Sequence, residues 1–159
     1  MTARYFFYGT LLDAEVRRLV LGSAAADDAL EAGLLPRHRL LLARGRHYPV
    51  PVRSTVADAP GEVTAPLGLE AAERLAFYEG PDYRARKLTI LDARGRSIDA
   101  LVFLPLRSVA PSTVAWDLTR WQRTVKPRFL KRVIAWMADY QPSTAVLAER
   151  RGGTRGRPS

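Results

Sequence analysis

The chain has 159 residues, of which 47% are hydrophobic and 26% are charged, as in an ordinary single-domain globular protein. It contains no cysteine, which excludes disulfides, a thiolate nucleophile and cysteine-based metal sites. The net charge of +9 suggests nucleic-acid binding, but the arginines are scattered and several crowd the last ten residues. The first residues do not read as a secretory signal, and no apolar stretch is long enough to span a bilayer. We therefore expect a soluble, cytoplasmic protein without a membrane partner.

The first predicted strand covers residues 4–8 and contains four consecutive aromatic residues, Tyr5 to Tyr8. Gly9 and Thr10 end it, and apolar residues at helical spacing then predict a helix over 13–21. A strand that leads into a helix through a glycine turn directs backbone N–H groups toward one point. That arrangement suits a carboxylate or an oxyanion, although many α/β proteins begin in the same way.

The middle and end of the chain predict further strands and helices. Strands are expected over 29–35, 39–43, 48–52 and 61–66, followed by a helix over 69–78 and a hairpin of strands 83–91 and 97–104. Loops are expected over 24–28 and 56–61. A long helix over 114–140 follows Pro111 and is expected to divide near Pro127, because proline cannot continue a helix without a break.

Strands outnumber helices and do not alternate with them, which predicts an α+β fold in place of a doubly wound parallel sheet. We expect a small mixed β-barrel with flanking helices. Residues 1–140 form the predicted domain. Residues 141–159 are predicted to be a basic, flexible tail, because the last ten residues contain glycine, proline and arginine without an apolar anchor.

Two short motifs carry a resemblance to a known family. The turn Tyr8-Gly9-Thr10-Leu11 and the segment 75–86, which includes Tyr78-Glu79-Gly80, resemble the γ-glutamylcyclotransferase superfamily, in its avirulence-induced-gene-like branch. The resemblance extends over residues 5–140 and includes the pair Tyr48-Pro49. It implies a mixed β-barrel with flanking helices and an enzyme that forms 5-oxoproline from a small γ-glutamyl amine, amino acid or peptide. It also implies a reaction without a metal or other cofactor.

Glu79 is the predicted catalytic residue. A carboxylate at the end of a helix opposes the negative pole of the helix dipole, and Phe77, Tyr78 and Gly80-Pro81 provide an apolar setting. Both features raise the pKa of a carboxyl group toward the range of a general base. The alternative is an ordinary solvent-facing glutamate at a helix end.

The resemblance also implies a set of substrate-binding residues. Tyr8, Gly9, Thr10 and Leu11 would hold the glutamyl group, with Thr10 and Leu11 N–H groups as donors, while Tyr83, Tyr48 and Arg86 would complete the pocket. For Arg86 the alternative is an exposed strand arginine, and for Tyr48 a core aromatic residue. Trp116, Trp121 and Trp136 are expected to anchor the C-terminal helices to the core. We expect one pocket to touch both Gly9–Leu11 and Glu79.

Two other functions remain open at this point. The chain could be a non-catalytic binding protein of the same fold, or an RNA-associated protein that acts through its basic tail. No specific nucleic-acid partner is expected, because the basic residues do not form one patch. His38 and His47 lack further ligands at a metal spacing, so no metal site is predicted. The presence of both Glu79 and the turn Tyr8-Gly9-Thr10-Leu11 favours the enzyme over the binding protein.

Overall fold

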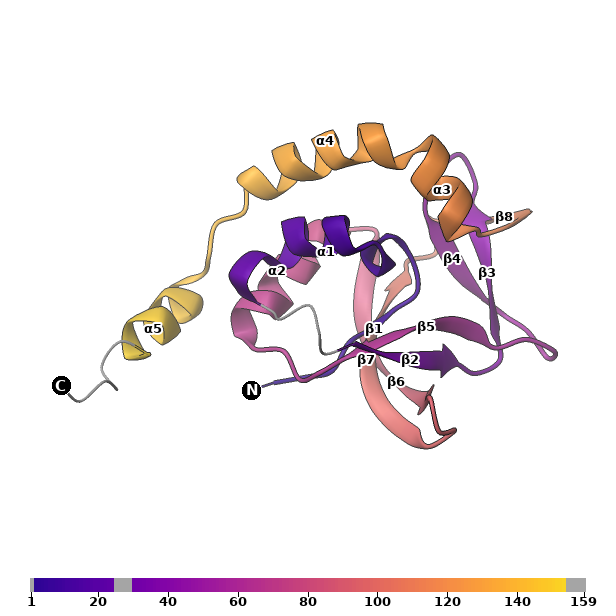
Figure 1. The fold of residues 1–159 in the computed structure, drawn as a ribbon, viewed down its shortest axis with the longest axis horizontal. Helices are drawn as coiled ribbons and strands as arrows, with labels where there is room; N and C mark the ends of the chain where they lie inside the picture. The colour runs from indigo at the N-terminus through magenta and orange to yellow at the C-terminus, as the bar shows by residue number, and fades with distance from the viewer. Residues whose placement is uncertain (1, 25–29, 154–159) are drawn as a thin grey trace.

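The strands of the computed structural model, which describes residues 2–24 and 30–153, are divided between two antiparallel sheets (Figure 1). The five-stranded sheet has the order β1 (Phe6–Phe7), β5 (Ala59–Thr64), β2 (Leu30–Leu35), β6 (Tyr83–Asp92) and β7 (Ser97–Pro105). The three-stranded sheet has the order β4 (Pro49–Arg53), β3 (His38–Ala43) and β8 (Pro111–Ala115). Helices pack against these strands, so the predicted α+β class is confirmed.

The five-stranded sheet curves until its two edge strands meet. The Leu101 N–H donates to the Arg4 C=O at 2.8 Å, and one parallel bridge joins Tyr5 to Leu101. Phe6 of one edge strand and Val102 of the other are buried in the same cluster. The predicted closed barrel is nevertheless not confirmed, because the strands of the described residues form two sheets and these two edges share a single bridge rather than a ladder.

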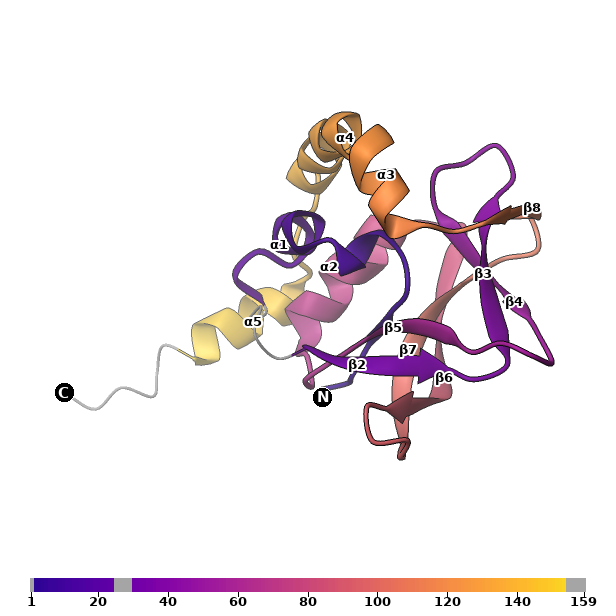
Figure 2. The same cartoon turned by 45° about the vertical axis from the view of Figure 1, so that its right-hand side comes forward.

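Two hydrophobic clusters lie on opposite sides of the first strand. Side chains alternate along a strand, so Tyr5 and Phe7 face one side while Phe6 and Tyr8 face the other. Tyr5 and Phe7 pack against the helices, which include α1 (Ala14–Leu21), α2 (Leu69–Glu79) and α4 (Lys126–Ala138). These three helices lie together on one side of the sheet (Figure 2). The aromatic run is therefore buried on both faces, as its composition predicted.

The chain after residue 110 differs from the prediction of one helix over 114–140. Residues 111–115 form β8, because Ser112, Thr113 and Val114 are short or β-branched residues that suit a strand, here paired with β3. The helices begin only at α3 (Leu118–Thr124), where the Asp117 side chain accepts the Arg120 N–H at 3.0 Å. The predicted break is confirmed, since Pro127 lies in the first turn of α4.

The predicted flexible tail over 141–159 is wrong for the part of it that the structure describes. Residues 144–152 form α5 (Thr144–Gly152), whose first turn is capped by the Ser143 hydroxyl. The Glu73 carboxylate of α2 accepts hydrogen bonds from the Ser143 N–H and hydroxyl, and Arg150 pairs with Glu70. Val146 supplies the apolar anchor that the sequence analysis did not identify in this segment, since only 1% of it is exposed.

The remaining elements are short. A 3-10 turn, η1 (Thr10–Leu12), follows the first strand, and a second, η2 (Gly22–Ala24), follows α1. The expected loop over 24–28 lies, beyond residue 24, outside the described residues, as do the last six residues of the expected tail. In the described part of the chain, no helix combines the length and the apolar character needed to cross a membrane.

Candidate active site

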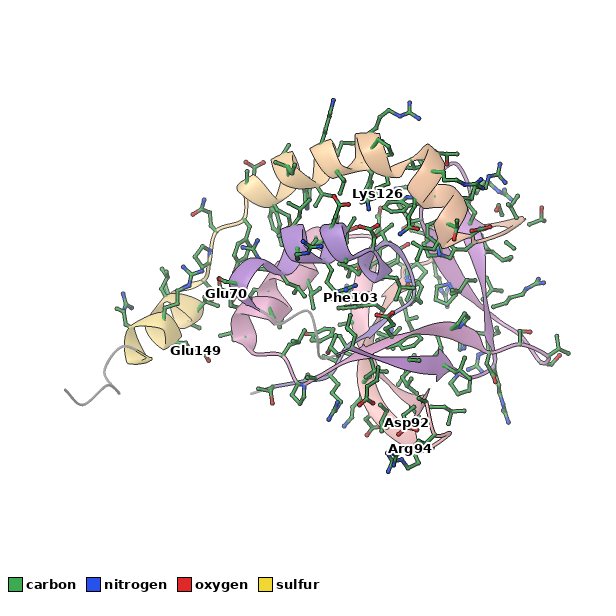
Figure 3. The ribbon with its side chains drawn as sticks, in the orientation of Figure 1. Glu70, Asp92, Arg94, Phe103, Lys126 and Glu149 are labelled. Carbon is green, nitrogen blue, oxygen red and sulfur yellow. The ribbon has the colours of Figure 1, made fainter. Side chains whose placement is uncertain are left out.

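A pocket of about 350 Å³ opens where the turn after β1, the end of α2, the start of β4 and one face of α4 meet. It is lined by residues 6–11 and 78–83, together with Arg46, Tyr48, Pro49, Phe103, Phe129, Arg132, Val133 and Trp136. Phe103 lies in the interior of the molecule, between the helices and the sheet (Figure 3). The expectation that one pocket touches both Gly9–Leu11 and Glu79 is confirmed.

The turn after β1 is held from both sides. The first hydrogen bond within the turn runs from the Leu12 N–H to the Gly9 C=O, at 3.0 Å. The Thr10 and Leu11 N–H groups precede this bond, so the hydrogen bonds of the turn do not use them. The Thr10 hydroxyl and the Tyr78 hydroxyl are hydrogen-bonded at 2.6 Å. This contact joins the turn to the end of α2, one residue before Glu79.

Glycine is required at position 9 because Pro49 lies too close to leave room for a Cβ atom, and not because of the backbone angles there. A Cβ atom at this position would lie 2.9 Å from Cγ of Pro49, a distance that real Cβ contacts do not reach. Pro49 begins β4 and lines the same pocket. The glycine therefore lets the turn and β4 form two adjacent parts of one wall.

Glu79 is the last residue of α2. Ala71 and Leu75 bury the inner face of this helix against the core, and Gly80 ends it with φ of 74°, while its N–H donates to the Ala76 C=O. The helix end and the core contacts together set the direction in which Glu79 leaves the backbone. Its side chain is half-buried and lines the pocket.

Burial raises the pKa of Glu79 to about 8, because a charged carboxylate loses hydration there. Burial also raises the pKa of the neighbouring Tyr8 and Tyr83 hydroxyls, with the charge of Glu79 as a smaller contribution. A carboxyl group that titrates near neutral pH can both accept and donate a proton.

The predicted site residues Tyr8, Tyr48 and Tyr83 line the pocket together with Glu79, and each has a contact that fixes its ring. The Tyr8 hydroxyl donates to the Phe103 C=O at 2.5 Å, and the Tyr83 hydroxyl donates to the Pro49 C=O at 3.4 Å. Tyr48 packs edge-on against Tyr83, with ring centroids 5.6 Å apart. The structure thus brings these predicted site residues together around the carboxyl group.

Arg86 is the predicted site residue that the structure does not bring to the pocket. It is exposed in the middle of β6, opposite Val102, and is not among the pocket-lining residues. Tyr83 and Arg86 are three residues apart in a strand, so their side chains point to opposite faces of the sheet. The prediction for Arg86 is therefore wrong, and the alternative of an exposed strand arginine is correct.

Two other arginines line the pocket, and the sequence analysis did not select either. Arg46 precedes β4, and Arg132 lies on α4 beside Trp136, which was expected only as a structural anchor. One face of α4 carries four pocket-lining residues at helical spacing: Phe129, Arg132, Val133 and Trp136. This spacing was the signal from which a shared helix face could have been predicted. Nothing in the sequence placed that face against the pocket. Trp121, by contrast, is buried in the core as expected.

Comparisons with known proteins identify the family and the fold of this chain. Residues 5–123 match the model of a family described as "Gamma-glutamyl cyclotransferase, AIG2-like". No curated protein matches the sequence. A solution structure from Arabidopsis thaliana is similar over 89% of this chain and 95% of its own, with 20% identity and a TM-score of 0.59.

Two further solved structures have the same fold. An AIG2-like protein from Mus musculus is similar over 73% of this chain and 88% of its own, with 19% identity and a TM-score of 0.55. A protein described as a gamma-glutamyl cyclotransferase is similar over 91% and 90% of the two chains, with 16% identity and a TM-score of 0.53. At these identities the solved structures support the fold alone.

Proposed function

The chain belongs to the AIG2-like gamma-glutamyl cyclotransferase family, and from that premise we propose that it converts a small γ-glutamyl compound to 5-oxoproline and a free amine. One observation carries the proposal: Glu79, with its pKa raised to about 8, lines the same pocket as the turn Gly9–Leu11. The pocket thus combines a proton-transferring group with backbone donors. Acyl transfer to an amine needs both.

The chemistry follows from the substrate carrying its own nucleophile. With its α-amine uncharged, the substrate attacks its own γ-carbonyl carbon, and the ring closes through a tetrahedral intermediate. The Thr10 and Leu11 N–H groups would stabilise the oxyanion of that intermediate. The Glu79 carboxylate accepts the proton from the attacking nitrogen and delivers it to the leaving nitrogen as the γ-amide C–N bond breaks. The carboxylate is regenerated, and 5-oxoproline and the amine leave.

Intramolecular attack explains why a single carboxyl group suffices. The reacting amine and carbonyl belong to one molecule, so the protein need only fold the chain into a ring-closing shape and move one proton. The tyrosine rings that line the pocket with Glu79 provide rigid walls for that folding. The direct test is incubation with a panel of γ-glutamyl amines, amino acids and peptides, with detection of 5-oxoproline. Binding without 5-oxoproline formation would favour the non-catalytic alternative.

The activity is expected to depend on pH through Glu79. A base with a pKa of about 8 is mostly protonated at pH 7, so kcat/KM should rise between pH 6 and 9 and level off as the carboxylate forms. The measurement is the rate of 5-oxoproline release at each pH in this range. Because the substrate α-amine also titrates, each rate is divided by the fraction of substrate whose amine is uncharged, which is measured in a separate titration. A flat corrected profile would show that no group of this pKa takes part.

The Gly9→Ala variant tests the position of the turn. Because the new methyl group would meet Pro49 at 2.9 Å, the turn or β4 must shift, which we expect to cost about 1–3 kcal/mol of unfolding free energy. A displaced oxyanion site should also lower kcat by about 10- to 100-fold. Gly68→Ala is the control, because a Cβ there has no atom within 4 Å. Equal activity of the two variants would contradict the role of the turn.

A further inference from the structure

Helix α4 forms one wall of the pocket, from a part of the chain that lies beyond the family match. The match ends at residue 123, and α4 begins at Lys126. Phe129, Arg132, Val133 and Trp136 all line the pocket and follow the i, i+3, i+4, i+7 spacing of one helix face. In the ribbon, α4 runs above α1 and α2 and contacts both (Figure 1).

This wall is held in place at both ends. The Trp136 indole N–H donates to the Phe77 C=O at 3.0 Å, and Phe77 lies two residues before Glu79. The Trp136 and Phe77 rings also pack together, with centroids 5.3 Å apart. At the other end, Phe129 packs edge-on against the buried Trp121 at 5.1 Å. A wall fixed in this way can select among substrates without first being ordered by them.

The two pocket-lining arginines differ in their partners. Arg46 already contacts the Asp82 carboxylate at 3.4 Å and donates to the Tyr48 hydroxyl at 2.8 Å. Within residues 2–24 and 30–153, no carboxylate forms an ion pair with Arg132. Arg132 is therefore the pocket-lining cation that is available to an anionic group of a ligand. A guanidinium group prefers a carboxylate, which it can bind through two parallel hydrogen bonds.

We propose that α4 recognises the leaving amine as an α-amino acid with an apolar side chain, whose carboxylate pairs with Arg132 while its side chain packs on Phe129 and Trp136. The substrate is then a γ-glutamyl derivative of an apolar amino acid. This inference rests on the proposed cyclotransferase function. The volume of about 350 Å³ is at the lower end for small-molecule sites and suits a compound of dipeptide size.

The test compares two substrates that differ only in the carboxylate, γ-glutamylphenylalanine and γ-glutamylphenethylamine. The wild-type protein should show kcat/KM about 10-fold higher for the first, mainly through a lower KM. Arg132→Gln should abolish that preference, so that the ratio of kcat/KM between the two compounds falls to about one. Arg128→Gln is the matched control, because Arg128 is exposed on the same helix and does not line the pocket. Equal turnover of both compounds by the wild-type protein overturns the inference.

A binding measurement separates failure of this inference from failure of the proposed function. Calorimetric titration of a Glu79→Gln protein with the same two compounds needs no turnover. About 10-fold tighter binding of γ-glutamylphenylalanine, lost on adding Arg132→Gln, supports the inference even if no compound is cyclised. Indistinguishable affinities overturn it even if cyclisation is observed. Absence of 5-oxoproline from every compound, at any affinity, counts against the proposed function alone.

Discussion

The Glu79→Gln variant is expected to fold and to lose cyclisation activity by about 10²- to 10⁴-fold, the usual cost of removing a general base. The amide has the size of the carboxyl group but cannot take a proton from the attacking nitrogen. Product binding should survive, because the turn Gly9–Leu11 is unchanged. The measurement is 5-oxoproline release under saturating substrate.

Glu149→Gln is the matched control for this variant. Glu149 is exposed on α5, outside the pocket and away from it (Figure 3). We expect wild-type turnover from the control. Wild-type turnover from Glu79→Gln as well would remove Glu79 from the mechanism, whereas an unfolded Glu79→Gln protein would make it a structural acceptor.

The Glu79→Gln substitution should also change how the stability of the protein depends on pH. The pKa of Glu79 rises from its ordinary value of 4.5 to about 8 on folding, so between these values the folded state binds more protons than the unfolded state. Stability of the wild-type protein therefore falls as pH rises through this window. Glu79→Gln lacks this loss and should be more stable at pH 9 by a few kcal/mol, with the difference vanishing toward pH 4. Urea denaturation at both pH values measures it.

The Asp13→Ala variant is expected to lose about 3–5 kcal/mol of unfolding free energy. Asp13 is 2% exposed and caps α1, accepting the Glu15 and Val16 N–H groups at 3.0 and 3.1 Å. It also accepts Gln122 Nε2 at 3.0 Å and pairs with Lys126 Nζ at 2.8 Å. One carboxylate thus joins the turn of the site to α3 and to the start of α4, where Lys126 lies. Its removal leaves Lys126 without its buried partner.

Two controls divide this loss into its parts. Asp117 is exposed, and its side chain caps α3 by accepting the Arg120 N–H. Asp117→Ala removes this cap and should cost about 1 kcal/mol of unfolding free energy. Asp13→Asn keeps a capping oxygen but removes the charge, so it should fall between the two alanine variants. Equal losses from Asp13→Ala and Asp117→Ala would show that the link to Lys126 contributes nothing.

The pH dependence of the Asp13 contribution has the opposite sign to that of Glu79. Burial alone would raise the pKa of Asp13, but hydrogen bonds from Lys126, the Val16 N–H and Gln122 outweigh it and hold the pKa below 3.8. The stabilisation is therefore complete above the unfolded value and is lost as pH falls through the lowered folded value. The difference between wild-type and Asp13→Ala should shrink in acid.

The sequence determined those features whose causes lie within a few residues along the chain. The aromatic strand ended by Gly9, the helix ended by Gly80 and the hairpin beginning at Tyr83 depend on side-chain alternation, helical spacing and turn residues, which are local properties. The two motifs that carried the family resemblance lie in those same turns. The errors at residues 111–115 and in α5 arose where a local signal was weak and a distant partner, such as β3 or Glu73, decided the structure.

Only the tertiary structure decided what surrounds the candidate base. The raised pKa of Glu79 arises from loss of water, which depends on how β1, β4 and α4 pack around the end of α2. Arg86, close to Glu79 in sequence, faces away from the pocket, while Arg132, more than fifty residues after Glu79, lines it. Distance along the chain does not limit packing, so a pocket wall and the charge that it carries can be assigned only after the elements are placed in space.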